Sequence, residues 1–242
     1  MREIADDIIA LLRKWGLAIH REGYPFIGIF AGVTLVLGLI WEPLWIPGIV
    51  LTLWCIYFFR DPDRVTPVRE GLVIAPADGR IQSIGIVRPP EDIVQDGTEM
   101  LRISIFMNVF DVHVNRAPLD ATLIDARYRP GKFLNASLDK ASVDNERMSL
   151  LMETPGGKAV GVVQIAGLIA RRIVCDVKPG DHVRAGQRFG MIRFGSRVDV
   201  YLPRETVPLV CENQRSVAGE TVLADISKER RGREAPRTGE IR

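Results

Sequence analysis

Residues 101–109 read Leu-Arg-Ile-Ser-Ile-Phe-Met-Asn-Val, a short apolar segment that contains several β-branched side chains. Similar segments recur between residues 71 and 225 and are separated by Gly, Pro and Asp, which favour turns. The others are residues 72–74, 81–87, 160–165, 173–174, 191–192 and 198–202. Many short strands bounded by turns predict a mainly β domain over residues 61–226, built as a sandwich or a flattened barrel.

Two of the turns are similar to each other: residues 75–81, APADGRI, and residues 178–187, KPGDHVRAGQ. Each places Gly and Asp between short apolar strands, as in the flattened barrels of biotinyl and lipoyl carrier domains. We therefore expect the mainly β domain to resemble those carriers in topology. With helices ahead of it, the whole chain is β-rich α+β.

Two uncharged runs, residues 26–41 and 44–59, precede this domain and are separated by Glu42 and Pro43. A helix of about 16 residues is roughly 24 Å long, somewhat less than the hydrocarbon thickness of about 30 Å. Residues 24–60 are therefore predicted to form a membrane hairpin, either two short spanning helices or a re-entrant pair. A buried hairpin in a soluble protein is the alternative.

Basic residues flank this hairpin on both sides and are absent from its turn. Arg13, Lys14 and Arg21 precede it, and Arg60 and Arg64 follow it. The positive-inside rule then places both ends in the cytoplasm, which predicts an inner-membrane protein with its catalytic domain on the cytoplasmic side.

The two ends of the chain differ from the rest. Residues 1–23 carry apolar side chains at helical spacing with charges between them, which predicts an amphipathic helix. Residues 227–242 are rich in basic side chains and poor in large apolar ones, so we expect a disordered tail.

Composition excludes several classes of function. The formal net charge is only +2, so no nucleic acid partner is expected. The three cysteines form no CxxC pair and the three histidines form no HExxH motif, so we expect neither a disulfide framework nor a metal site. These residues are Cys55, Cys175, Cys211, His20, His113 and His182.

The sequence of residues 193–203, RFGSRVDVYLP, resembles the processing site of the phosphatidylserine decarboxylases, short bacterial type. In that family a Gly-Ser bond breaks and the serine becomes a pyruvoyl group. The residue types suit this chemistry, because a serine hydroxyl can attack the preceding carbonyl and glycine leaves that carbonyl sterically open. Gly195 and Ser196 are the matching pair.

Further blocks carry the same resemblance, in the family's order, so it covers residues 58–203 and, with the hairpin, most of the chain. They are residues 58–62, FFRDP; 75–79, APADG; 106–118, FMNVFDVHVNRAP; and 131–147, which begins GKFLNA and ends NER.

The resemblance implies a membrane-bound lyase of phospholipid biosynthesis, made as a zymogen. It would cleave itself into chains 1–195 and 196–242 and would need no metal. Its substrate would be phosphatidylserine in the membrane, converted to phosphatidylethanolamine and CO2 through a Schiff base with the pyruvoyl group at Ser196. Whether the protein is a homo-oligomer is left open.

The resemblance also implies an Asp-His pair that activates the serine, matching Asp78 and His113, with His113 as the general acid in turnover. Longer family members carry a second histidine three residues after the first and usually assign it the triad role. This chain has Arg116 there. Either His113 serves both steps, or another group supplies the base.

Three alternatives remain at this point. A membrane-anchored serine hydrolase would use Ser196, His113 and Asp78 directly, although the Gly-x-Ser-x-Gly elbow is absent. A carrier module would use Lys140 in the Asp-Lys-Ala sequence of residues 139–141. A pyruvoyl decarboxylase for a soluble substrate is disfavoured by the apolar hairpin.

Overall fold

A computed structural model describes residues 18–94, 96–131, 145–167, 172–193 and 196–227. The chain divides into two compact units, residues 1–63 and residues 64–242. Three predictions fall outside the described residues and stay predictions. They concern most of the amphipathic segment 1–23, Gly195 at the cleavage site, and the tail beyond Ser227. Lys140, the residue of the carrier alternative, also lies outside the described residues.

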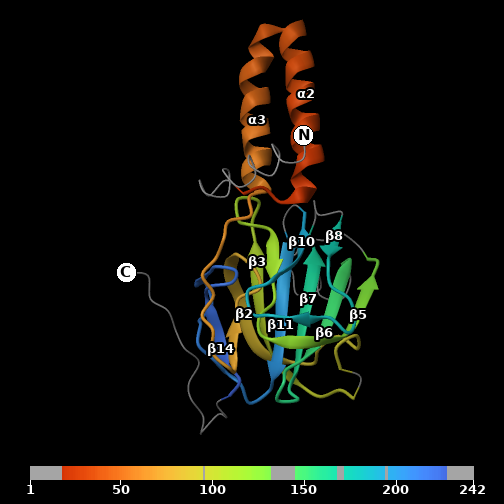
Figure 1. Cartoon of the computed structure of the whole chain (residues 1–242), viewed down its shortest axis with the longest axis vertical. Helices are drawn as coiled ribbons and strands as arrows, with labels where there is room; N and C mark the ends of the chain where they lie inside the picture. The colour runs from red at the N-terminus through yellow and green to blue at the C-terminus, as the bar shows by residue number, and fades with distance from the viewer. Residues whose placement is uncertain (1–17, 95, 132–144, 168–171, 194–195, 228–242) are drawn as a thin grey trace. The chain divides into compact units, whose positions relative to one another are not determined.

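The first unit contains two apolar helices, α2 (Tyr24–Ile40) and α3 (Trp45–Phe58), with the short 3₁₀ turn η1 (Arg21–Gly23) ahead of them (Figure 1). Between them lies a second 3₁₀ turn, η2 (Glu42–Leu44), which holds Pro43 in its first turn, where the missing N–H costs no hydrogen bond. The predicted apolar helices are confirmed, together with the turn at Glu42 and Pro43.

Small side chains let the two helices pack closely. A Cβ atom on Gly48 would lie 2.6 Å from the methyl group of Thr34, so only glycine fits there. The hydroxyl groups of Thr34 and Thr52 lie 3.2 Å apart across the same interface. The helix pair is therefore held by both van der Waals contact and a polar bridge, as in packed membrane helices.

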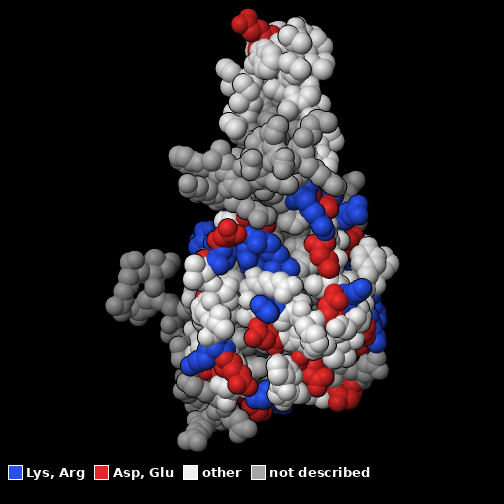
Figure 2. Space-filling model, in the orientation of Figure 1, with Lys and Arg blue, Asp and Glu red and all other residues white. Residues whose placement is uncertain are grey.

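The outer surface of this helix pair is apolar. Large side chains such as Leu39 and Ile40 are 74% exposed, and Figure 2 shows white along the helices, whereas charged residues gather over the strands. The segment Arg21–Ile40 is long and apolar enough to cross a membrane, and the apolar helix Glu42–Phe58 is shorter. An apolar surface of this kind marks a membrane or protein contact.

The second unit is built from strands in three sheets (Figure 1). One sheet of eight strands has the order β13-β2-β3-β11-β7-β6-β5-β9, and two of three strands have the orders β1-β14-β12 and β4-β10-β8. The strands are β1 Leu72–Ile74, β2 Gly79–Val87, β3 Met100–Met107, β4 Val114–Arg116, β5 Ala121–Arg129, β6 Arg147–Glu153, β7 Ala159–Ala166, β8 Ile173–Cys175, β9 His182–Val183, β10 Arg188–Ile192, β11 Ser196–Pro203, β12 Val207–Pro208, β13 Arg215–Ser216 and β14 Val222–Asp225.

Strand β11 is central to the large sheet and is antiparallel to β3 and β7 on its two sides. Because side chains alternate along a strand, Val198, Val200 and Leu202 face the main core, which also contains residues of both smaller sheets. The predicted mainly β class is confirmed. The likeness to biotinyl and lipoyl carriers stays a prediction.

The other face of the large sheet carries a buried polar cluster around Asp92, in the connection between β2 and β3. The Asp92 carboxylate accepts hydrogen bonds from Arg129 at 2.9 Å, from Arg147 at 3.1 Å and from Ser149 at 3.4 Å. The side chains of Asp92 and Arg147 are only 1% and 8% exposed. This carboxylate therefore fixes the β2–β3 connection to β5 and β6.

We expect Asp92→Ala to destabilise the folded protein by about 3–5 kcal/mol, because it removes a buried carboxylate that accepts hydrogen bonds from the buried Arg147 guanidinium. Thermal unfolding of the full chain in detergent should show a Tm lower by roughly 10 °C. Asp125→Ala is the matched control, since the Asp125–Arg127 pair is far more exposed than Asp92 and Arg147 and should contribute less than about 1 kcal/mol. Equal Tm values for the two variants would contradict the assignment.

Candidate active site

Ser196 is the first residue of β11 and is fully buried. It pairs with Met107 at the end of β3 and with Ala166 at the end of β7. Alternation along β11 turns its side chain toward the main core, where Oγ lies 4.0 Å from the Met107 sulfur. Sulfur is a weak acceptor, so this contact leaves the hydroxyl available for other chemistry.

The chain reaches Ser196 from a different sheet. Strand β10 pairs with β4 and β8, and the next described strand, β11, lies between β3 and β7. The backbone N–H of Ile192, at the end of β10, points to the carbonyl of His113 at 3.3 Å. The backbone at Ser196 is therefore where the chain crosses between two sheets, and His113 contacts the strand that leads to this crossing.

His113 is fully buried. At one of its ring nitrogens, the contact that orients the ring is a backbone carbonyl and not a carboxylate. Its Nδ1 lies 2.9 Å from the carbonyl oxygen of Asp111. A carbonyl only accepts, so Nδ1 carries the proton and Nε2 is the basic nitrogen of the neutral ring. The loop is built locally, because Asn108 N–H donates to the Asp111 carboxylate at 2.9 Å and Phe110 N–H donates to Asn108 Oδ1 at 2.8 Å.

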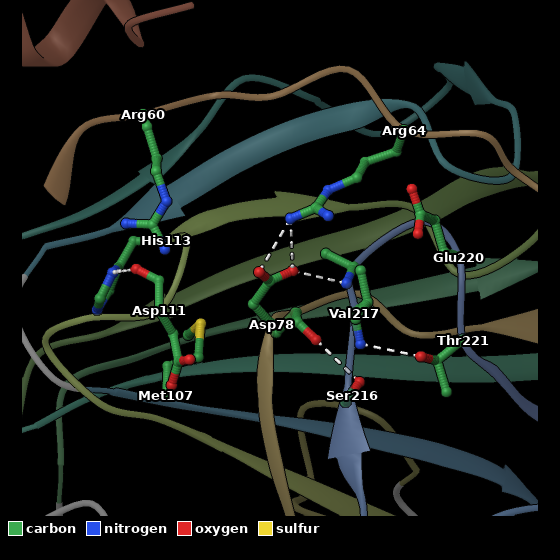
Figure 3. A network of polar contacts seen from close by, with 12 residues as sticks. Arg60, Arg64, Asp78, Met107, Asp111, His113, Ser216, Val217, Glu220 and Thr221 are labelled. Carbon is green, nitrogen blue, oxygen red and sulfur yellow. Dashed lines mark hydrogen bonds and ion pairs between the residues drawn. The ribbon is translucent and has the colours of Figure 1, made fainter. Parts of the chain in front are cut away.

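Asp78 is buried and accepts hydrogen bonds from two directions (Figure 3). Arg64 Nη2 lies 2.9 and 3.2 Å from its two carboxylate oxygens, and the backbone N–H of Ala218 donates to Oδ1 at 2.8 Å. The neighbouring carbonyl of Ala77 accepts from the Ser216 hydroxyl at 3.0 Å. In Figure 3 the Asp78 carboxylate points to Arg64, whereas the His113 ring lies beside Asp111.

The structure thus places all three predicted side chains in the same unit, each of them buried. It gives Asp78 a set of partners that the sequence did not suggest, foremost Arg64, which we had interpreted only as a flanking positive charge. The role of Asp78 in orienting His113 stays a prediction. His182, by contrast, is exposed and its ring lies 2.8 Å from the Thr122 hydroxyl.

Gly79, directly after Asp78, has a φ of +148°, and a Cβ atom there would lie 2.1 Å from the backbone oxygen of Phe106. We expect Gly79→Ala to cost about 3 kcal/mol or more, because the strained φ and the backbone clash add. Thermal unfolding should show this against Gly85→Ala on the same strand, where a Cβ meets no atom within 4 Å. A Gly79→Ala protein as stable as the Gly85→Ala control would contradict the reasoning.

Two buried amide side chains near Ser196 were missed by sequence reasoning. Gln164 and Asn115 are both fully buried, and Gln164 Nε2 donates to Asn115 Oδ1 at 2.8 Å. Asn115 Nδ2 lies 3.9 Å from the same Met107 sulfur that Ser196 contacts. The available signal was a glutamine inside an otherwise apolar segment, residues 160–165.

Arg116, at the position where the resemblance places a second histidine, is also buried. Its guanidinium donates to the carbonyl of Gly186 at 2.9 Å, and its backbone N–H donates to the carbonyl of Pro76 at 2.9 Å. Arg116 therefore ties β4 to two neighbouring loops. A guanidinium remains protonated in proteins, so it does not replace the missing histidine as a base.

No group of three or more His, Cys, Asp or Glu side chains suited to a metal ion occurs in the part of the chain that the structure describes. The free thiols of Cys55, Cys175 and Cys211 are not part of any such group. Burial raises the pKa of Cys175, which makes this thiol a poorer metal ligand and nucleophile at neutral pH.

Comparisons with known proteins agree over nearly the whole chain. The family model described as phosphatidylserine decarboxylase matches residues 51–224. A phosphatidylserine decarboxylase proenzyme of Paramagnetospirillum magneticum is 58% identical over 234 residues, which cover 97% of this chain and 96% of that protein. A phosphatidylserine decarboxylase proenzyme of Cereibacter sphaeroides is also 58% identical over 234 residues, covering 97% of this chain and 99% of the relative.

Proposed function

The chain belongs to the phosphatidylserine decarboxylase family, and on that premise we propose that it works through a pyruvoyl group made from its own Ser196. It converts phosphatidylserine to phosphatidylethanolamine and CO2 and is made as a proenzyme. The carrying observation is the buried position of Ser196 at the start of β11, where the chain crosses between two sheets. The serine hydrolase and carrier alternatives are set aside, because the relatives are decarboxylase proenzymes.

The surroundings of Ser196 fit such a group. Its side chain lies in the core between Met107 and Ala166, so a small uncharged group of similar size can take its place. A site closed to bulk water protects a reactive ketone from side reactions. The pyruvoyl group supplies a carbonyl that takes the substrate amine and accepts the electrons released as CO2 leaves.

In self-cleavage, the Ser196 hydroxyl is the nucleophile and its proton needs a base. We assign that base to His113, because the Asp111 carbonyl holds the proton on Nδ1 and leaves Nε2 as the basic nitrogen. Cleavage between Gly195 and Ser196 separates the chain into residues 1–195 and 196–242. The absence of the family's second histidine makes a double role for His113 the simplest assignment.

In turnover, His113 serves as the general acid. A protonated imidazole beside the reacting carbon supplies the proton that replaces the departing carboxylate. The ring's burial and its backbone hydrogen bond hold it in one orientation for this transfer.

Asp78 is assigned to the predicted Asp-His-Ser group, and its contacts add a second role. Arg64 and Asp78 both belong to the larger future chain, whereas Ala218 belongs to the smaller one. The carboxylate therefore links the two chains after cleavage. Strand pairing does the same on a larger scale, because β11 lies between β3 and β7, and β14 pairs with β1.

Association with a membrane is supported by the apolar helix of spanning length. We assign the protein to the inner membrane with its catalytic unit on the cytoplasmic side, since Arg21 and Arg60 flank the helix pair and its turn carries only Glu42. A lipid substrate gives the reason for an anchor, because the head group must be reached at the bilayer surface.

The intact mass of the purified protein, measured under denaturing conditions, tests this proposal. We expect a fragment of about 5 kDa that covers residues 196–242 and is about 17 Da lighter than its serine-started sequence, because ammonia has been lost. A single uncut chain of 27.0 kDa from a preparation that releases CO2 from phosphatidylserine would refute the pyruvoyl assignment.

A further inference from the structure

The two buried amides beside Ser196 keep unused hydrogen-bonding capacity. Gln164 Oε1 has no hydrogen-bond partner among the residues that the structure describes. In the same set of residues, the acceptor for Asn115 Nδ2 is the thioether of Met107 at 3.9 Å, a weak one. A buried polar atom without a good partner costs roughly 1–3 kcal/mol.

The neighbours of the two amides are mostly apolar, so water is not at hand to satisfy their polar atoms. Gln164 projects from β7 toward the main core, in the same row of the sheet as Val198 on β11 and Ile105 on β3, which are apolar. Asn115 comes from β4, in a different sheet. If both amides were replaced together by apolar side chains of similar shape, the free energy of folding would change little. Packing therefore does not explain why amides occupy these two positions.

Their position relative to Ser196 supplies one. Ala166, two residues after Gln164, is the direct partner of Ser196 across the sheet. Asn115 Nδ2 and Ser196 Oγ lie 3.9 and 4.0 Å from the same Met107 sulfur, so one flexible side chain separates the amide donor from the nucleophile.

We propose that Gln164 and Asn115 form a positioning pair for the self-cleavage of Ser196, an inference that rests on the proposed function. Asn115 Nδ2 donates to Ser196 Oγ while its proton is removed, and Gln164 holds the Asn115 amide in place through the 2.8 Å hydrogen bond. Oγ then bonds to the preceding carbonyl carbon as the peptide C–N bond breaks. The base passes the hydroxyl proton to the released nitrogen, and the amides keep their own protons.

The test follows cutting after synthesis, measured as the fraction of uncut full-length chain over time by denaturing mass spectrometry. We expect Asn115→Leu to slow cutting about ten-fold or more, by analogy with the loss of a preorganised donor. Gln164→Met should slow it less. Because Gln164 acts through Asn115, the double variant should cut no more slowly than Asn115→Leu alone.

A purely structural role predicts a different outcome. Loss of structure would make the two effects on cutting additive and would lower the Tm of the double variant, whereas the proposal predicts a double variant with an unchanged or higher Tm, because both amides are then replaced by apolar side chains. Ser104→Ala is the matched control, since Ser104 is a buried β3 residue on the other face of the same sheet and its hydroxyl has no hydrogen-bond partner among the described residues. It should cut at the wild-type rate.

Each further outcome decides the matter. Wild-type cutting by folded Asn115→Leu would overturn the proposal, as would additive slowing with a lower Tm in the double variant. If Asn115→Leu does not fold, Gln164→Met decides alone: slowed cutting by the folded variant supports the positioning role, and wild-type cutting overturns it. A wild-type chain that never cuts would instead overturn the proposed function, and this inference with it.

Discussion

Ser196→Ala is expected to remain a single uncut chain and to release no CO2 from phosphatidylserine. The variant lacks the hydroxyl that attacks the preceding carbonyl, and alanine cannot lose water or ammonia to become a ketone. Because the side chain is fully buried and the Met107 sulfur that its hydroxyl contacts is a weak acceptor, folding should be little affected. Denaturing mass spectrometry and a CO2-release assay on the same preparation measure both effects.

Ser104→Ala is the control for this experiment, because it removes another fully buried hydroxyl from the neighbouring strand β3. It should cut and turn over normally. Normal activity in Ser196→Ala would end the pyruvoyl proposal, since the variant lacks the residue assigned as the source of the group.

His113→Ala is expected to slow self-cleavage by roughly 10²–10⁴-fold, the usual contribution of a positioned general base. Any cut protein that accumulates should also decarboxylate slowly, because the same ring is assigned as the acid in turnover. Uncut fraction over time and CO2 release per cut chain separate the two roles.

His182→Ala provides the comparison, since that histidine is exposed and its ring Nδ1 lies 2.8 Å from the Thr122 hydroxyl. It should behave like wild type in both assays. Complete cutting of His113→Ala at the wild-type rate would move the processing role to another group. Slow turnover with normal cutting would leave His113 with the acid role alone.

Much of the secondary structure could be predicted from local sequence patterns. Short apolar segments such as residues 198–202 become strands because β-branched side chains favour extended backbone and bury well on a sheet. The uncharged runs on either side of Glu42 and Pro43 become helices, because a long apolar run with a single break has few other ways to satisfy its backbone. The family motif around Ser196 could also be identified from the local sequence alone, in residues 193–203.

Tertiary structure decided what each chemical group contacts. Strand order was not readable, so neither was the position of β11 between β3 and β7, which brings Ser196 to Met107 and Ala166. The partners of Asp78 lie 14 and 140 residues away along the chain. Gln164 and Asn115, which come from different sheets, meet for the same reason.

What the sequence by itself determined was the type of the elements in its apolar segments, the two apolar helices included; a local motif also motivates Ser196 as the proposed reacting serine. These follow from side-chain periodicity, hydropathy and a local motif, which act over a few residues. What only the tertiary structure decided was the pairing of distant polar groups: Arg64 with Asp78, His113 with the Asp111 carbonyl, and Gln164 with Asn115. Hydrogen bonds and burial depend on distances in space, and long-range strand pairing sets those distances.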